Sequence, residues 1–181
     1  MIVERALVLA FSAMGFLAFT WAWRRHFHSV GPMPLGMRLV GLISFVTVAA
    51  FIWSVIMMPL PKTWLAAPIL SIGSLALFIW TIRATRTAGF AVAFAAAQPL
   101  SLTVNGPFRY VRHPFYTSYI IFWLATCFAT TSSVYWFGPT ILLACYIVAA
   151  RKEEQLMLRG DLGVRYADYA SKTGMFLPRW A

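Results

Sequence analysis

The stretch NGPFRYVRHPFYTSYIIFWLA, Asn105–Ala125, joins a basic segment to a largely apolar run of the kind found in membrane helices. Arg109, Arg112 and His113 come directly before the run, and Pro114 opens it. Proline suits the first position of a helix, because the backbone N–H that it lacks has no partner there. The basic side chains are therefore either anchors at a membrane surface or one wall of a site at the mouth of a helix bundle.

The composition is that of a membrane protein. Hydrophobic residues make up 61% of the 181-residue chain and charged residues only 11%, whereas charged residues make up about 25% of a soluble domain. Apolar stretches of about 17 or more residues predict transmembrane helices. We predict an all-α integral membrane protein with about five such helices, at Leu7–Trp23, Leu39–Met58, Leu65–Ile82, Phe115–Thr130 and Val134–Ala150. The apolar stretch Ala88–Ala97 is shorter and suits an interfacial or re-entrant segment.

The chain is predicted to form a single membrane domain, residues 1–181. Residues 1–82 supply three N-terminal transmembrane helices, and residues 83–181 hold the last two helices and a tail. Only the short polar sequence TTSS, Thr130–Ser133, separates those two helices, which predicts a tight antiparallel helical hairpin.

The segment after the last transmembrane helix is polar. We expect the helix to continue through Arg151–Arg159 outside the membrane and to be broken by Gly160 and Gly163, because glycine is a poor helix former. The closing sequence TGMFLPRW, Thr173–Trp180, is expected to be an irregular tail.

The net charge is +10, and its distribution predicts the orientation in the membrane. With five spans and the N-terminus outside, thirteen basic residues lie on one side and only Arg5 and Lys62 on the other. Basic residues favour the cytoplasmic side, so the C-terminus and any site beside it are expected to face the cytoplasm, at the inner (cell) membrane of a bacterium or an archaeon. The charge indicates attraction to anionic lipid rather than nucleic-acid binding.

The predicted hairpin places two motifs at the same height. Its midpoint lies near residue 131 or 132, so His113 is about 18 residues away on one arm and Glu153 and Glu154 are about 22 away on the other. At about 1.5 Å per residue, the two groups differ by roughly 4–6 Å along the axis. Because neighbouring helices pack about 8–10 Å apart, the motifs RHP and EE are predicted to meet, or to hold one small ligand between them.

Two interpretations of this meeting point stay open. Adjacent carboxylates repel each other and need a nearby cation, which Arg109, Arg112 or a ligand could supply. An interfacial salt-bridge cluster that anchors the hairpin is the alternative to a ligand site. His113 is expected to be neutral, because the dipole at a helix N-terminus disfavours the protonated ring.

Other site types find no support in the sequence. His26 and His28 are two residues apart, a spacing that does not place both on one helix face, so we expect no metal site. There is no strand pattern to carry a Rossmann-type nucleotide site.

The motifs GPFRYVRHPFYTS and EEQLMLRGDLGVRYADYASKTGMFLP together resemble the isoprenylcysteine carboxyl methyltransferase and phospholipid methyltransferase superfamily. Its members share G-P-aromatic, R-H-P-x-Y-x-G, a helical hairpin, E-E and a later F-G-x-x-Y-x-x-Y with a proline. The resemblance covers about Leu100–Pro178. The three N-terminal spans match only as generic helices.

The resemblance implies a membrane methyltransferase that uses S-adenosyl-L-methionine and acts on a lipophilic small molecule or lipid. The last two helices and the tail would form the cofactor pocket, with Tyr166 and Tyr169 helping to close it. The implied cofactor-binding residues are Leu100, Ser101, Leu102, Thr103, Gly106, Phe108, Arg112, His113, Pro114, Phe115, Tyr116, Glu153 and Glu154. Arg151 is the candidate for contact with the substrate.

Three positions depart from the family pattern. Ser118 stands where the R-H-P-x-Y-x-G motif has glycine, and Phe108 stands where some members have tyrosine. The prenylcysteine enzymes carry an arginine at the position of Ala150, beside Arg151, so prenylcysteine itself is in doubt as the substrate. Membrane sterol reductases, which use NADPH, carry the same R-H-P-x-Y and E-E signature and are a second functional class. A non-catalytic membrane protein is the third.

Overall fold

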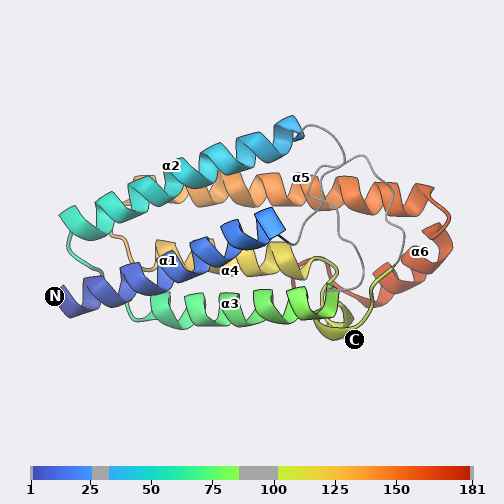
Figure 1. Cartoon of the computed structure of the whole chain (residues 1–181), viewed down its shortest axis with the longest axis horizontal. Coiled ribbons are helices and arrows are strands. Elements are labelled where there is room, and N and C mark those ends of the chain that lie inside the picture. Colours follow the sequence, from blue (N-terminus) through green and yellow to red (C-terminus); the bar gives the residue numbers. More distant parts are fainter. Residues whose placement is uncertain (1, 26–32, 86–101, 180–181) are drawn as a thin grey trace.

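The computed structural model describes residues 2–25, 33–85 and 102–179, and its long helices run up and down beside one another (Figure 1). No strand occurs in these ranges, as an all-α fold requires. The helices are α1 (Ile2–Arg25), α2 (Leu35–Met57), α3 (Ala66–Thr85), α4 (Pro114–Cys127), α5 (Phe137–Arg159) and α6 (Gly163–Lys172), with short 3₁₀ turns η1 (Gly106–Arg109) and η2 (Ser133–Trp136).

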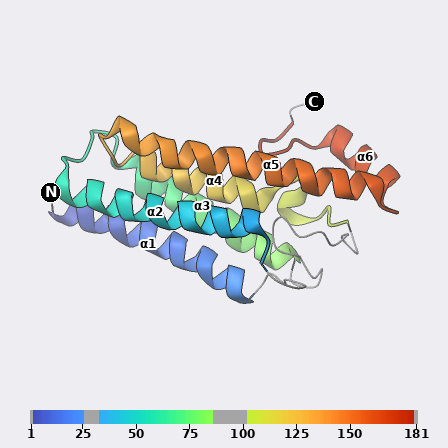
Figure 2. The ribbon, with the colours of Figure 1, turned by 90° about the horizontal axis from the view of Figure 1, so that it is seen from above.

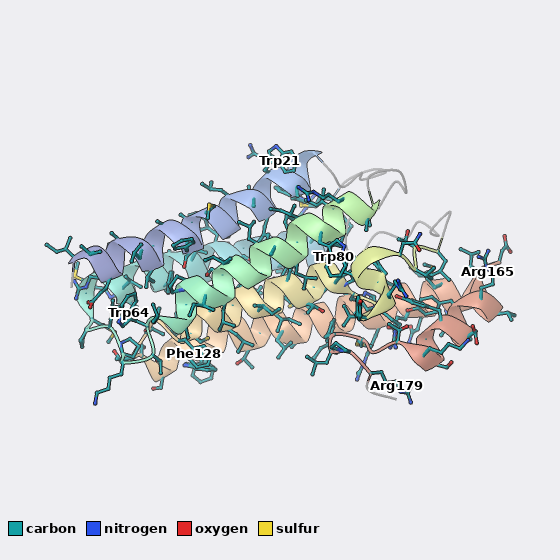
Figure 3. All side chains as sticks on the ribbon, turned by 90° about the horizontal axis from the view of Figure 1, so that it is seen from below. Trp21, Trp64, Trp80, Phe128, Arg165 and Arg179 are labelled. Atoms are coloured by element: carbon teal, nitrogen blue, oxygen red, sulfur yellow. The ribbon has the colours of Figure 1, made fainter. Side chains whose placement is uncertain are left out.

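The two ends of the bundle differ in chemistry. At one end, here called the basic end, α1, α3 and α5 finish and α2 and α4 begin; the N-terminus lies at the opposite, far end (Figure 1). Trp64 and Phe128 lie at the far end, while Arg165 and Arg179 lie toward the basic end (Figure 3). Aromatic residues near one boundary and arginines beyond the other suit a bundle that crosses a membrane.

Four of the five predicted spans have the length of a transmembrane helix. Among the described residues, the segments long and apolar enough to cross a membrane are Ile2–Arg24, Leu35–Met57, Ala66–Thr85 and Ser133–Arg159. The fourth expected span is α4, which has only 14 residues. At about 1.5 Å per residue it is about 21 Å long, short of a hydrocarbon core of about 30 Å.

The shortness of α4 follows from the polar sequence at its end. The helix stops at Cys127, and side-chain hydrogen bonds help to hold the connection to α5. The hydroxyl of Thr130 pairs with that of Ser54 on α2 and accepts from the backbone N–H of Ser132, while the Tyr135 hydroxyl donates to Thr126 over 2.8 Å. These bonds fix the predicted hairpin with a longer turn than TTSS alone.

Helix α4 is the central element of the bundle, because it contacts α1, α3 and α5. Phe19 on α1 packs edge-on against Phe78 on α3 and Tyr119 on α4, with ring centroids 4.7 and 4.8 Å apart. Ser118, found where the family motif has glycine, is fully buried between α3 and α4. Its hydroxyl donates to the Phe115 carbonyl over 2.6 Å, and its own carbonyl accepts from the Ser74 hydroxyl over 2.7 Å. Serine therefore satisfies its own polar group and still permits close helix packing.

The segment after α5 agrees with the sequence prediction only in part. Helix α5 continues to Arg159 and ends at Gly160, as predicted. Gly163, expected to break the helix, instead begins α6, because its backbone N–H donates to the Gly160 carbonyl and closes a turn. A side chain at Gly163 would also collide with the backbone of Leu158. Helix α6 and the segment that follows it, as far as Arg179, therefore fold back at the basic end (Figure 2).

A tight contact between α2 and α5 gives a test of the packing. A Cβ atom added at Gly138 would lie 2.9 Å from Cγ2 of Thr47, whose hydroxyl is held on the Ile43 carbonyl at 2.7 Å. We expect Gly138→Ala to cost about 1–3 kcal/mol through overpacking, seen as a lower melting temperature in detergent. Gly73→Ala is the matched control, because nothing lies within 4 Å of its added Cβ; equal melting temperatures for both variants would contradict this contact.

Candidate active site

The start of α4 and the end of α5 meet at the basic end, as the hairpin spacing predicts. Nε2 of His113 lies 3.1 Å from Oε1 of Glu154, and Nδ1 lies 3.6 Å from Oε2 of Glu153. Nε of Arg112 donates to Oε1 of Glu154 over 2.7 Å. The motifs RHP and EE are therefore in direct contact, and Arg112 rather than Arg109 supplies the expected cation.

The two adjacent carboxylates have different surroundings. Glu154 is 16% exposed and is held by both Arg112 and His113. Glu153 is 37% exposed, accepts a 2.5 Å hydrogen bond from the Tyr116 hydroxyl, and lines a cavity. Glu154 thus serves the contact between helices, while Glu153 keeps acceptor capacity for a ligand.

His113 differs from its sequence-based expectation, which was a neutral ring. Burial opposes the charged form, but the hydrogen bonds and negative charges of Glu153 and Glu154 outweigh it and raise the pKa of His113 above its ordinary value. The expected direction of the shift in the pKa of His113 was wrong, because the expectation weighed only the dipole of α4. Two carboxylates in contact with the ring act more strongly than the partial charge of a helix end.

A cavity of about 530 Å³ opens beside these groups, a volume typical of a small-molecule site. One wall comes from α4 and α5, and the opposite wall from α1 and α2. Charged side chains gather at its basic end, and its remaining lining is mostly apolar and aromatic. Among the lining residues are Phe16, Phe19, Arg38, Phe45, Trp123 and Tyr146.

Stacked aromatic rings form the wall contributed by α4 and α5. The ring of Tyr116 stacks on His113 and on Tyr146, with centroid distances of 5.6 Å in each pair. Nε1 of Trp123 donates to the Tyr146 hydroxyl over 3.0 Å, and this bond holds the Tyr146 ring of the stack in place. Ring faces that border a cavity can receive a cation, and Glu153 lies beside them.

Several of these cavity residues were missed by the sequence analysis. Tyr116, Tyr119 and Trp123 recur at three- and four-residue spacing, and Tyr146 lies seven residues before Glu153, so each set shares a helix face. That periodicity could have pointed to Trp123 and Tyr146. No comparable signal marks the wall from α1 and α2.

Most of the predicted site residues that the structure describes line the cavity, namely Phe108, Arg112, His113, Pro114, Phe115, Tyr116 and Glu153. Gly106 packs instead against Ala84 and Trp80 of α3, with a positive φ of 60° that suits glycine. Arg151 is exposed on α5 and does not line the cavity.

Leu102 and Thr103, which were expected to bind the cofactor, do not line this cavity. Leu102 lines a separate, shallow groove with Tyr169, and Thr103 is half-buried. Leu100 and Ser101 lie outside the described residues, as do His26, His28 and the stretch Ala88–Ala97. Within the part of the chain that the structure describes, no group of three or more His, Cys, Asp or Glu side chains could hold a metal ion.

The tail folds against the same charged group. Nη1 of Arg112 donates to the carbonyls of Ala170 and Thr173. The backbone N–H groups of Arg112 and His113 donate to Gly174 and Met175 over 2.8 and 3.1 Å. The tail is irregular, as predicted, but it is fixed in place.

Two tyrosines of α6 complete this packing. The Tyr169 hydroxyl donates to the Phe108 carbonyl over 2.6 Å, and Tyr166 is buried beside Arg112 and Glu154. Helix α6 is thereby joined to η1 and to the ion-paired group.

A model of the phospholipid methyltransferase family matches residues 61–160, more than half of the sequence. The chain belongs to this family. The match runs from before α3 to the end of α5 and so includes a helix that the motifs alone left unassigned. Membership makes the protein a membrane methyltransferase that acts on lipids, and it favours that class over the sterol reductases. No curated protein matches the sequence.

The role of Arg112 in holding the tail can be measured. We expect Arg112→Ala to raise hydrogen–deuterium exchange across residues 170–176 by at least tenfold, because breaking a buried ion pair costs about 3–5 kcal/mol. Arg109→Ala is the matched control, since Arg109 is exposed on η1. Unchanged exchange in the Arg112 variant would show that the tail is held by its backbone bonds alone.

The charge of His113 is testable by titration. Because its pKa is raised in the folded protein, stabilisation by the carboxylates is complete below pH about 6.5 and is lost as pH rises through the folded value. Nuclear magnetic resonance of ¹⁵N-histidine-labelled protein should show a ring that titrates above pH 6.5. In Glu154→Gln the titration should move to lower pH; an unshifted curve would contradict the assigned contact.

Proposed function

We propose that this protein transfers the methyl group of S-adenosyl-L-methionine to a membrane lipid, with the reaction at the cytoplasm-facing basic end of the bundle. The observation that carries the proposal is the position of Glu153, a partly open carboxylate on the wall of an aromatic cavity. The excess of basic residues at the same end supports its cytoplasmic orientation.

The residues around the cavity fit the cofactor. Its amino group needs an acceptor, and Glu153 has accessible carboxylate oxygen. Its sulfonium suits aromatic faces, which Tyr116 and Tyr146 supply in a stacked pair. When bound, S-adenosyl-L-methionine supplies a methyl group that is already activated for displacement.

The role of the protein is then to bind the cofactor and the lipid acceptor, to align them and to exclude water. The charged group of His113 and Glu154 fixes the end of α5, and so the position of Glu153. The apolar side chains of Phe16, Phe19 and Phe45 line the cavity and exclude water from the place where the methyl group would be transferred. Alignment of the reactants and exclusion of water are the main contributions that such a site makes to rate.

Several features support a lipid acceptor other than a prenylcysteine carboxylate. Ala150, at the position where the prenylcysteine enzymes carry an arginine, is fully buried and offers no charge. Arg151 is exposed and is not among the residues that line the cavity. The apolar part of a lipid would lie along the cavity between the α1–α2 wall and the hairpin.

The assignment of Glu153 is tested by cofactor binding. Calorimetry on the detergent-solubilised protein should show micromolar affinity for S-adenosylhomocysteine, and Glu153→Gln should weaken it about 10- to 100-fold, the range for a hydrogen bond to a charged group. Asp161→Asn is the matched control, since Asp161 is exposed beyond α5. Binding of NADPH in place of S-adenosylhomocysteine would instead support a reductase.

The reaction itself is tested with labelled S-adenosyl-L-methionine and a lipid extract of the native host. Mass spectrometry should find the label in a lipid product. Absence of any labelled lipid, despite tight cofactor binding, would contradict a lipid acceptor.

A further inference from the structure

Only one of the two walls of the cavity lies within the residues that the family model matches. The wall from α4 and α5 lies within the matched residues 61–160, whereas the wall from α1 and α2 lies wholly before them. A cofactor shared by a family is held by the part of the chain that the family shares. The α1–α2 wall is therefore the part of the cavity in which contacts to the acceptor are expected.

Among the described residues of that wall, the one charged side chain that lines the cavity is Arg38, in the first turns of α2. The guanidinium of Arg38 has no hydrogen bond or ion pair with any described residue. The undescribed residues 1, 26–32, 86–101 and 180–181 include no Asp or Glu side chain. The cavity thus holds an arginine that is paired with no described carboxylate.

The carboxylates of the chain are otherwise accounted for. Glu4 lies at the far end, Glu154 is held by Arg112 and His113, and Asp168 pairs with Lys172 over 2.8 Å. Asp161 lies in the turn beyond α5 and does not line the cavity. Glu153 is the only described carboxylate in the cavity lining.

Arg38 and Glu153 lie at matching depth. Helices α2 and α5 are neighbours that run in opposite directions, and Ser44 of α2 and Tyr146 of α5 both line the cavity, close enough for Ser44 to affect the Tyr146 hydroxyl. Arg38 is six residues from Ser44 toward the basic end, and Glu153 is seven residues from Tyr146 in the same direction. At about 1.5 Å per residue these steps are about 9 and about 10 Å.

The cavity therefore has a positive group on one wall, a carboxylate at the same height on the other, and apolar lining further into the bundle. A ligand that matches it is amphipathic, with an anionic group near Arg38 and its chains pointing away from the basic end. Arginine binds phosphate with two parallel N–H donors. Resting on the proposed methyl transfer to lipid, we propose that Arg38 selects the acceptor by binding the phosphate of its headgroup.

The test compares Arg38→Gln with Arg83→Gln in detergent-solubilised protein saturated with S-adenosylhomocysteine. Arg83 is the matched control, an exposed arginine in the last turn of α3 that does not line the cavity. The probes are dihexanoyl phosphatidylethanolamine, dihexanoylglycerol, which lacks the phosphate, and inorganic phosphate. Binding is measured by calorimetry.

The wild-type protein should bind the phospholipid probe at least tenfold more tightly than dihexanoylglycerol, the smallest loss expected when a hydrogen bond to a charged group is removed. Arg38→Gln should remove that preference, Arg38→Lys should restore part of it, and Arg83→Gln should leave it intact. Inorganic phosphate should not compete at concentrations where the phospholipid binds, because it lacks the apolar chains.

Three outcomes would overturn the proposal. In the first, the wild-type protein binds the two lipid probes equally tightly, or binds neither of them. Another is an unchanged preference in Arg38→Gln. The third is weaker S-adenosylhomocysteine binding in Arg38→Gln, which would assign the guanidinium to the carboxylate of the cofactor. Failure of the wild-type protein to bind S-adenosylhomocysteine would refute the proposed function separately.

Discussion

The arrangement of the site depends on one ion-paired contact, in which Glu154 lies between Arg112 and His113. This contact joins the first residue before α4 to the last part of α5 and brings the tail with it through the carbonyls of Ala170 and Thr173. Such a group is stable only while all its members are present, since a buried charge without its partner is costly. The charges at the end of the hairpin therefore fix the relative height of α4, α5 and the tail together.

The two glutamates perform different tasks because they are neighbours on a helix. Consecutive residues on an α-helix point about 100° apart, so Glu154 can face α4 while Glu153 borders the cavity. The contact that Glu154 makes with α4 thereby orients Glu153. The stacked rings of Tyr116 and Tyr146 extend the same wall, and the Tyr116 hydroxyl completes it by donating to Glu153. The sequence presented anchoring and ligand binding as alternatives; Glu154 makes the anchoring contact, and ligand binding is the role that we propose for its neighbour Glu153.

Where the sequence-based expectations failed, a contact between distant residues outweighed a local tendency. His113 was expected to be neutral from its place at a helix N-terminus, but two carboxylates from α5 raise its pKa. Gly163 was expected to end a helix, but the turn closed on Gly160 makes it the first residue of α6. The span beginning at Phe115 was expected to reach Thr130, whose hydroxyl is instead paired with Ser54 of α2.

The sequence by itself determined the apolar helices, the antiparallel hairpin and the meeting of RHP with EE, because hydrophobic length and residue spacing follow from the covalent chain and the rise of a helix. Only the tertiary structure decided which glutamate faces the cavity and that Arg38 of α2 stands opposite it. When a helix is apolar on nearly every side, its sequence does not predict how the helix is rotated about its axis or which helices it packs against. Those choices are made by side-chain packing between helices, as in the tight contact of Gly138 with Thr47.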